Sequence, residues 1–94
     1  MPASVRHTDI CTGHGCYPPR PNAAGSPNVF TNLLAEHRVS DPWQPHCCPP
    51  VCHASTQASG SPNVFTNLLS CARVGDQVAC GSSNAMGSPN VFVN

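Results

Sequence analysis

The sequence of 94 residues predicts an all-β protein, a small conical β-prism with three sides, pseudo-threefold symmetry and many loops. Three observations support this fold class. A segment of eight to ten residues occurs three times, eleven prolines and seven glycines disfavour long helices, and regularly spaced His and Cys residues indicate a metal ion at the apex. At this length the stability that a hydrophobic core alone can provide is marginal, so an additional stabilising feature is expected. We expect a single domain over residues 1–94.

The repeated segment predicts three β-strands. It reads Gly-Ser-Pro-Asn-Val-Phe-Thr-Asn-Leu-Leu at residues 25–34 and again at 60–69, and Gly-Ser-Pro-Asn-Val-Phe-Val-Asn at 87–94. Val, Phe and Thr favour an extended backbone, and Pro is tolerated where a strand starts. Asn32 and Asn67 follow the first two runs and predict hairpin turns, because Asn adopts positive φ angles readily.

A second pattern, Arg-x-x-Asp, indicates how the third repeat is completed. It occurs at residues 38–41 and 73–76, after the first two copies, and near the N-terminus at 6–9. The N-terminal segment is therefore the predicted return strand of the third copy. The repeats then lie around residues 25–41, 60–76 and 87–94, the last closed by 3–9. Closing such a ring removes exposed sheet edges.

Two points about this ring stay open at the level of sequence. Phe30, Phe65 and Phe92 are equivalent positions, and they face either the axis or the layer between hairpins. The alternative to a ring is a single small sandwich of three similar strands.

The spacing of His and Cys residues after each repeat Asp predicts a metal centre. His14 and His46 each come five residues after a repeat Asp, and Cys80 comes four residues after the third. If the prism narrows there, these side chains converge on its axis, and His53 completes a tetrahedron. Three imidazoles and one thiolate suit Zn²⁺, with Fe²⁺ as the second choice. Four protein ligands leave no open position, so the site would be structural and not catalytic.

The other His and Cys residues leave alternatives open. Five cysteines lie close to the predicted ligands in the sequence: Cys11, Cys16, Cys47, Cys48 and Cys52. The first two could pair, and the last three could displace a ligand or form a disulfide. Cys71 is expected to be a small buried apolar residue, and His7 and His37 are left outside the site. Because residues 1–6 hold no apolar stretch for a signal peptide, a reduced metal site is favoured over a disulfide framework.

Charge and composition argue against several functional classes. Four Arg balance three Asp and one Glu, and Lys is absent, whereas nucleic-acid binders carry a basic surplus. No apolar run approaches the roughly 20 residues that span a bilayer. A hydrolase built on Cys52 and His53 is disfavoured, because neighbours in sequence rarely present both side chains to one substrate. The remaining alternative is a disulfide-rich exported binding peptide.

Taken together, the repeat Gly-Ser-Pro-Asn-Val-Phe-x-Asn, the element Arg-Val-Gly-Asp and the following His-Gly or Cys-Gly resemble the PAAR-repeat proteins. The resemblance covers essentially the whole chain. It implies a cone of short strands whose apex holds a metal ion through three His and one Cys. The matching positions here are His14, His46, His53 and Cys80. The chain departs from the family at the hairpin turns, which read Asn-Leu where Asn-Gly is common, and at Ser40, which replaces a Gly.

The resemblance also implies a mechanical role without enzymatic activity. The chain would be the membrane-piercing tip that caps and sharpens the central spike of a contractile injection machine, either a phage tail baseplate or a type VI secretion system. Its partner would be a trimeric β-helical spike protein, VgrG-like or a phage tail spike, with one tip per spike and transient contact with the target-cell envelope. It would reside at the tail tip of a virion, or in the bacterial cytoplasm before export on the apparatus.

Overall fold

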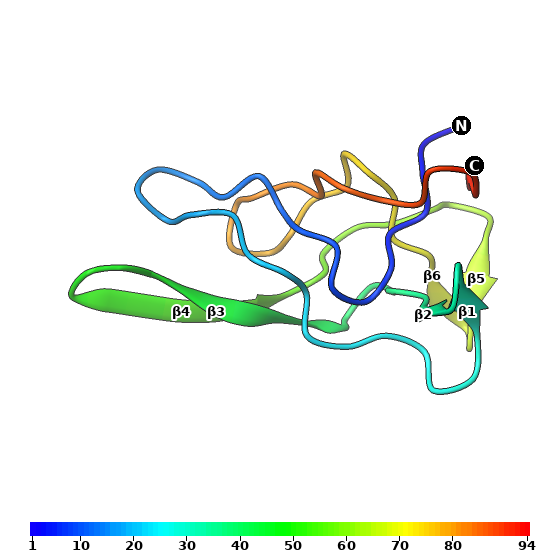
Figure 1. Cartoon of the computed structure of the whole chain (residues 1–94), viewed down its shortest axis with the longest axis horizontal. Helices are drawn as coiled ribbons and strands as arrows, with labels where there is room; N and C mark the ends of the chain where they lie inside the picture. The colour runs from blue at the N-terminus through cyan, green and yellow to red at the C-terminus, as the bar shows by residue number, and fades with distance from the viewer.

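Short antiparallel strands and the turns between them make up the fold, which contains no helix. The computed structural model describes all residues, 1–94. The strands are β1 (Phe30–Thr31), β2 (Leu34–Ala35), β3 (Pro42–Cys48), β4 (Val51–Thr56), β5 (Phe65–Thr66) and β6 (Leu69–Ser70). They form three separate two-stranded sheets, β1–β2, β3–β4 and β5–β6 (Figure 1). The all-β prediction is confirmed, and the alternative of one small sandwich is wrong. With no helix present, none could span a membrane.

The first and third sheets are tight hairpins with the turns that the sequence predicts. In β1–β2, Thr31 pairs with Leu34, so the turn consists of Asn32 and Leu33. Their φ angles are 54° and 67°, and the corresponding residues of β5–β6, Asn67 and Leu68, have 53° and 68°. Two consecutive positive φ angles define a type I′ turn, which matches the twist of the strands. Leu therefore replaces the common Gly without changing the turn type, although a left-handed Leu costs about 1 kcal/mol.

The strands are shorter than predicted, because the start of each repeat is a bend. Ser26 Oγ accepts hydrogen bonds from the backbone N–H groups of Asn28 and Val29, at 3.2 and 2.9 Å. The Ser of each other copy makes the same two bonds. A hydroxyl that binds the backbone in this way competes with strand pairing, and the next residue, Pro27, has no N–H to donate. The predicted strand over the whole repeat is therefore wrong, and pairing begins only at Phe30.

The N-terminal segment pairs with the third copy of the repeat. Ala3 forms an antiparallel bridge with Phe92. The N–H of Ser4 donates to Val91 O, and the N–H of Val93 donates to Pro2 O, both at 3.0 Å. Phe92 thus pairs with Ala3 as Phe30 pairs with Ala35 in the first copy.

A closed cycle of buried backbone hydrogen bonds joins the three copies. The N–H of Val5 donates to Ala72 O at 3.1 Å. The N–H of Ala72 donates to His37 O, and that of His37 returns to Val5 O, both at 3.0 Å. All three residues have no exposed surface. Each copy therefore gives one hydrogen bond and receives one, which fits the predicted threefold arrangement.

A second cycle connects the repeats through their Ser hydroxyls. Ser26 Oγ donates to Asn67 Oδ1 of the second copy at 2.6 Å. Ser88 Oγ in the third copy donates to Asn32 Oδ1 of the first at 2.5 Å. Ser61 Oγ reaches the carbonyl of Asn94. The Ser and Asn positions recur in the sequence because each repeat Ser forms a hydrogen bond to an Asn of another copy.

The Arg-x-x-Asp elements are three equivalent ion-paired turns. Each Arg pairs with the Asp three residues later, at 2.8–2.9 Å, and all three Asp are buried. The residue before each Asp has a positive φ angle: 80° for Thr8, 79° for Ser40 and 94° for Gly75. The family Gly is explained by this backbone conformation. Ser40 keeps the same conformation, so its substitution leaves the turn intact.

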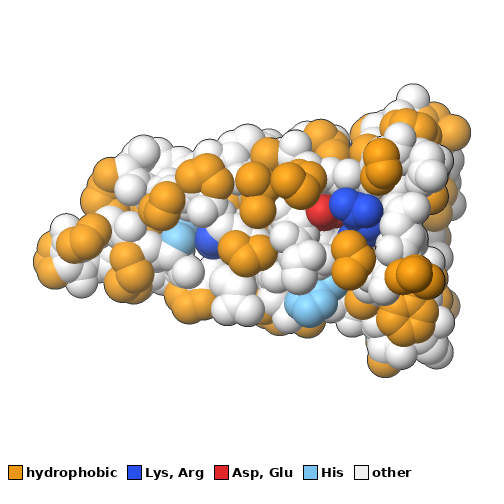
Figure 2. All heavy atoms as spheres, viewed as in Figure 1, with side chains coloured by type: hydrophobic (Ala, Val, Ile, Leu, Met, Phe, Trp, Pro, Cys, Tyr) orange, Lys and Arg blue, Asp and Glu red, His pale blue; other side chains and the backbone are white.

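The molecule tapers along its longest axis, with principal extents of 37, 24 and 22 Å. The β3–β4 hairpin reaches the narrow end, whereas β1, β2, β5, β6 and both termini lie at the wide end (Figure 1). Hydrophobic side chains are exposed along the whole molecule and line the edge of the wide end (Figure 2). We call this end the base face and define it by its exposed residues Phe30, Leu33, Phe65, Leu68 and Phe92. The three Phe residues are 49–59% exposed, so they do not face the axis.

The interior contains little apolar material. Of 22 buried residues, six are hydrophobic and sixteen are polar or charged. The hydrophobic cluster consists of Cys11, Trp43 and Val78, with Cys80 packed against it. The fold therefore depends on its cyclic hydrogen bonds and ion-paired turns more than on a hydrophobic core.

Candidate metal centre

A tight turn at the narrow end holds His14. The N–H of His14 donates to Tyr17 O at 3.0 Å, and the N–H of Tyr17 donates to His14 O at 2.8 Å. The turn requires glycine at position 13, where φ is 73° and a Cβ atom would lie 2.5 Å from Tyr17 O. His14 is thereby presented at the end of a loop that closes on itself.

The β3–β4 hairpin supplies His46 and His53, which are directly opposite each other in register. A register shift between Trp43 and His46 marks a β-bulge in β3. Trp43 and His46 are three positions apart and would point to opposite faces of a regular strand. Both are buried, because the extra residue of a bulge changes the alternation of side chains. The bulge thus directs Trp43 into the core and His46 into the cluster beyond it.

Cys80 comes from a third segment, a turn near the C-terminus. The N–H of Val78 donates to Ser82 O at 2.8 Å, and the N–H of Gly81 donates to Val78 O at 2.9 Å. Since Val78 is buried in the core, this turn is anchored at its base. Cys80 is left partly exposed above the hydrophobic cluster.

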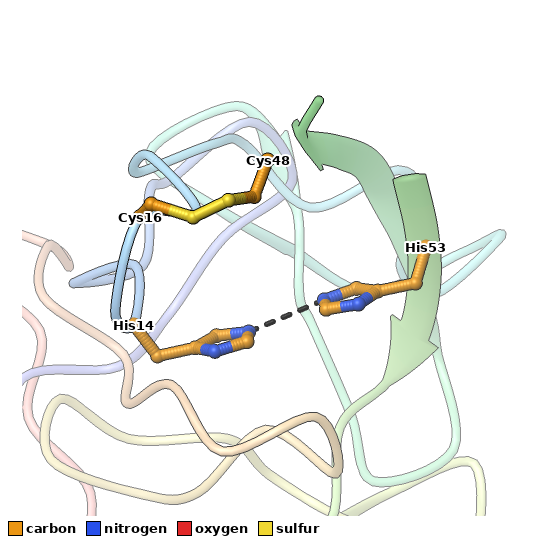
Figure 3. Close-up of a disulfide and its surroundings, with 4 residues drawn as sticks. All are labelled: His14, Cys16, Cys48 and His53. Carbon is orange, nitrogen blue, oxygen red and sulfur yellow. Dashed lines mark hydrogen bonds between the residues drawn. A yellow bond between two sulfur atoms is a disulfide. The ribbon is translucent and has the colours of Figure 1, made fainter. Parts of the chain in front are cut away.

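The structure brings the four predicted side chains together. The nearest ligand atoms of His14, His46, His53 and Cys80 all lie within 4.8 Å of one another. His14 Nε2 is 3.2 Å from His53 Nε2, and Figure 3 shows the two rings facing each other. His46 Nε2 is 2.6 Å from His53 Nε2. His7 and His37 lie outside this group, as expected.

The donor set fits a tetrahedral metal ion. Nitrogen ligands at about 2.0–2.1 Å from Zn²⁺ lie roughly 3.3 Å from each other. The His14–His53 separation already matches this value, whereas His46 and His53 would have to separate by several tenths of an ångström. Three imidazoles and a thiolate are characteristic of zinc sites, and four protein ligands close the coordination sphere.

His46 is oriented by the backbone. Its Nδ1 lies 2.8 Å from Pro18 O. A carbonyl oxygen only accepts hydrogen bonds, so Nδ1 carries the hydrogen and the lone pair of Nε2 faces the cluster. Metal-binding histidines commonly have a partner of this kind, which fixes the ring and its tautomer.

Tyr17, which belongs to none of the sequence patterns described above, covers the cluster. Its ring stacks on His53 with centroids 4.2 Å apart and on His14 at 4.8 Å. It also lies 4.9 Å from the ring of His46. Tyr17 is the only Tyr of the chain and comes three residues after His14. This position close to a predicted ligand is the signal by which the sequence could have identified it.

Arg20, also missed, supports the thiolate side of the centre. It is 5% exposed and is the one Arg without a carboxylate partner. Its Nη2 donates to Cys80 Sγ at 3.4 Å, its Nη1 to Cys11 Sγ at 2.9 Å, and its Nε to Gln44 O at 2.8 Å. Its guanidinium also lies 5.0 Å from the centre of the Trp43 ring. The sequence signal was that Arg20 alone lies outside an Arg-x-x-Asp element.

These contacts favour the charged form of Cys80. Burial raises the pKa of a thiol, but hydrogen bonds from Ser82 and Arg20 outweigh it and lower the pKa of Cys80 to about 5. The pKa of Cys11 is also lowered, because hydrogen bonds from Arg20 and Gly13 together outweigh the opposing effect of burial. The thiolate is the form that binds metals, so Cys80 is prepared as a ligand at neutral pH.

The remaining cysteines form two disulfides, Cys16–Cys48 and Cys47–Cys52. Of the two possibilities for positions 47, 48 and 52, disulfide formation is therefore observed, and none displaces a ligand. The possible Cys11–Cys16 pair is wrong, because Cys11 is buried beside Trp43 whereas Cys16 lies exposed on the His14 loop. The preference for a reduced site over disulfides is also corrected: the narrow end combines both. Cys71 is buried, as expected.

Comparison with known proteins places this arrangement in a family. No curated protein matches the chain. The sequence profile of the PAAR motif matches residues 12–86, which include all four residues of the His and Cys cluster. Because the match covers most of the chain and the fold is all-β with a tapering, metal-ready end, the protein belongs to the PAAR motif family.

Proposed function

We propose that this protein is the structural tip of a contractile injection machine, where it caps and sharpens a trimeric β-helical spike. The observation that carries the proposal is the contrast between the two ends of the molecule. The base face is broad and apolar, whereas the opposite end is narrow and contains the His and Cys cluster. Exposed apolar patches of this kind mark interaction sites. Membership of the PAAR motif family supports the same role.

The base face carries a specific sign of a partner. Leu33 and Leu68 are 94% and 95% exposed, and both adopt a backbone conformation that disfavours Leu. Neither solvent exposure nor turn geometry favours Leu at these positions, so contact with another protein is the remaining reason for it. The three equivalent Phe positions fit a threefold partner, so that one copy of the tip caps one trimeric spike. That spike is VgrG-like or a phage tail spike.

In this proposal the narrow end is fixed by a structural metal ion. His14, His46, His53 and Cys80 hold Zn²⁺, with Fe²⁺ as the alternative. The closed donor set leaves no position for a substrate or water, so the role is structural and not enzymatic. A metal is valuable where the hydrophobic core is small, since structural zinc contributes roughly 10–16 kcal/mol in small domains. A rigid tip then suits the piercing of a target-cell envelope, from a virion tail or after export from the bacterial cytoplasm.

Binding to a trimeric spike protein from the same genome tests the proposal. Leu33→Asp combined with Leu68→Asp places charges in the base face and should abolish a complex of one tip with one trimer. Val51→Asp is the matched control, because Val51 is an exposed aliphatic residue at the narrow end. Sedimentation or size-exclusion chromatography with light scattering measures the complex. Spike binding by the double Leu variant at wild-type strength would exclude the base face as the docking surface.

The two disulfides favour one alternative function, a disulfide-rich exported binding peptide. The two functions differ in their need for a metal. A spike tip of the kind proposed contains one metal ion per chain when purified, whereas a disulfide-stapled peptide needs none. Elemental analysis of protein purified without chelators distinguishes them.

A further inference from the structure

The Cys16–Cys48 disulfide connects two of the three segments that supply the metal centre. Cys16 comes two residues after His14 on the same loop, and Cys48 comes two residues after His46 on β3. Residues two apart on a strand share a face, so Cys48 lies on the side of β3 that carries His46. Figure 3 shows the disulfide beside the facing rings of His14 and His53, joining the loop to the hairpin. The bridge spans 32 residues of sequence.

Few other contacts hold the His14 loop against the hairpin. The backbone hydrogen bonds of His14 and Tyr17 are made to each other, and no backbone hydrogen bond joins residues 13–17 to β3 or β4. What remains is the hydrogen bond between His46 Nδ1 and Pro18 O, the 3.2 Å contact between His14 Nε2 and His53 Nε2, and the packing of the His14 and Tyr17 rings on the hairpin histidines. The Cys16–Cys48 disulfide is the only disulfide that joins the His14 loop to the hairpin.

We propose that the Cys16–Cys48 disulfide preorganises the metal centre, so that the tip binds its metal tightly when oxidised and more weakly when reduced. The inference rests on the proposed metal centre. Without the bridge, His14 must be brought to His46 and His53 at the moment of binding, and the cost of ordering the loop is subtracted from the affinity. The device would couple metal retention to the redox state of the compartment.

The redox step balances without participation of the metal. Two molecules of a low-molecular-weight thiol attack in succession. The first breaks the bond between the two Sγ atoms and forms a mixed disulfide, and the second releases it as the oxidised form of the small thiol. Two electrons and two protons pass to Cys16 and Cys48. By linkage, the factor by which oxidation strengthens metal binding is also the factor by which the metal stabilises the disulfide.

The second disulfide provides a matched control within the same chain. Cys47 and Cys52 are directly opposite in the β3–β4 register, so their bridge joins strands that are already paired. Cys47 alternates with His46 and Cys48, which places this bridge on the outer face of the hairpin. Both of its residues are exposed. Its removal leaves the His14 loop attached.

Zinc affinity, measured at neutral pH by competition with a chromogenic chelator, tests the inference. We expect the Cys16→Ser, Cys48→Ser protein to bind zinc about tenfold or more weakly than the wild type, in the range known for supporting groups around metal sites. The Cys47→Ser, Cys52→Ser protein should retain wild-type affinity. Equal affinity of both double variants and the wild type would overturn the inference while leaving the metal centre intact. A wild-type protein that binds no zinc would instead overturn the metal centre itself.

A second measurement covers the case in which the first variant does not fold. The Cys47→Ser, Cys52→Ser protein keeps one disulfide and can be equilibrated with reduced and oxidised glutathione at buffered free zinc. Alkylation and mass spectrometry then give the oxidised fraction of Cys16 and Cys48. Zinc should shift the midpoint to more reducing potentials, by about 30 mV for each tenfold coupling. An unchanged midpoint, or a shift toward oxidising potentials because the free thiols recruit zinc, contradicts the inference.

Discussion

At the scale of single residues, Arg20 shows how a buried positive charge can be used without a carboxylate partner. Its guanidinium is satisfied by Cys11, Cys80 and the Gln44 carbonyl, and it lies near the Trp43 ring. A buried cation without such partners would be strongly destabilising. Two of these partners are thiols whose pKa it lowers, so Arg20 connects the hydrophobic cluster to the metal centre.

Replacing Arg20 by Gln should raise the pKa of Cys80. The wild-type value is about 5, held down by hydrogen bonds from Ser82 and Arg20 against the effect of burial. Loss of the guanidinium should move it toward the ordinary value of a thiol, about 8.5. Ultraviolet absorbance of the thiolate, followed against pH in metal-free protein, measures the shift. Arg38→Gln is the control for loss of a positive charge, and an equal shift in that variant would argue against a local effect of Arg20.

Glu36 presents the opposite case, a buried carboxyl group without an ion pair. It is 3% exposed and accepts hydrogen bonds from Ser4 and Thr31. Burial is the largest cause of its raised pKa, and the hydrogen bonds from the two hydroxyls oppose it. Because the folded state then holds the proton more tightly than the unfolded state, this group contributes most below the unfolded pKa, and its contribution is lost as pH rises through the folded pKa.

Glu36→Gln should therefore increase stability at neutral pH and leave it nearly unchanged in acid. The amide is neutral at every pH, so the cost of burying a charge disappears while a carbonyl oxygen remains to accept from Ser4. Thermal unfolding of both proteins from acid to neutral pH measures the difference. A gain that is equally large at low pH would show that the raised pKa is not its cause.

At the scale of elements, the hairpin turns combine a preferred turn type with an unfavourable residue. Asn32 suits the first position of a type I′ turn, and Leu33 occupies the second with a φ angle of 67°. Leu68 repeats this choice in β5–β6. Stability alone favours Gly at both second positions, so the two Leu residues point to a function of the base face.

Leu33→Gly should stabilise the isolated protein and weaken the binding to a spike protein proposed above. Gly adopts the left-handed conformation without the strain of Leu, but it has greater conformational freedom in the unfolded chain. The net gain in the free energy of unfolding should be roughly 0.5–1 kcal/mol. In a domain of this size that corresponds to a rise of a few degrees in Tm. Leu34→Gly in β2 is the control and should lower Tm, because a strand residue loses packing and gains no strain relief. A lower Tm for Leu33→Gly would mean that Leu33 packs within its own chain.

The same elements show where sequence reasoning succeeds and where it does not. The turns at Asn32 and Asn67 were predictable, because equivalent positions of a repeat adopt equivalent conformations. The length of the strands was not predictable. Ser26 Oγ accepts hydrogen bonds from two backbone N–H groups and forms a bend, which strand propensity does not describe. The Cys16–Cys48 pairing was also out of reach. It depends on the approach of a loop to a hairpin 32 residues away, which no local pattern records.

At the scale of the whole molecule, the small hydrophobic core makes the metal centre the expected main source of stability at the narrow end. His14, His46, His53 and Cys80 were predictable as a group because the repeat placed three of them in equivalent positions. Tyr17 and Arg20, which support them, lie outside the repeat and were missed. A periodic pattern thus identifies the clustered His and Cys side chains more readily than the residues packed around them.

Metal removal should destabilise the protein strongly. We expect chelation to lower Tm by roughly 20 °C or more, since about 4–8 °C are lost per kcal/mol in domains of this size. Scanning calorimetry with and without chelator measures the change. A variant carrying His14→Ala and Cys80→Ala should melt at the lower temperature and be insensitive to chelator. An unchanged Tm of the wild type after complete metal loss would show that the metal does not stabilise the protein.

The pairing of Ala3 with Phe92 has a consequence for how the molecule is made. During synthesis residues 2–5 emerge from the ribosome long before their hydrogen-bond partners Ala72 and Val91. The ring can therefore close only late, and such distant pairings slow folding. A circular permutant that links residue 94 to residue 1 and opens the chain elsewhere should form the three copies of the repeat in sequential order. It should therefore refold faster.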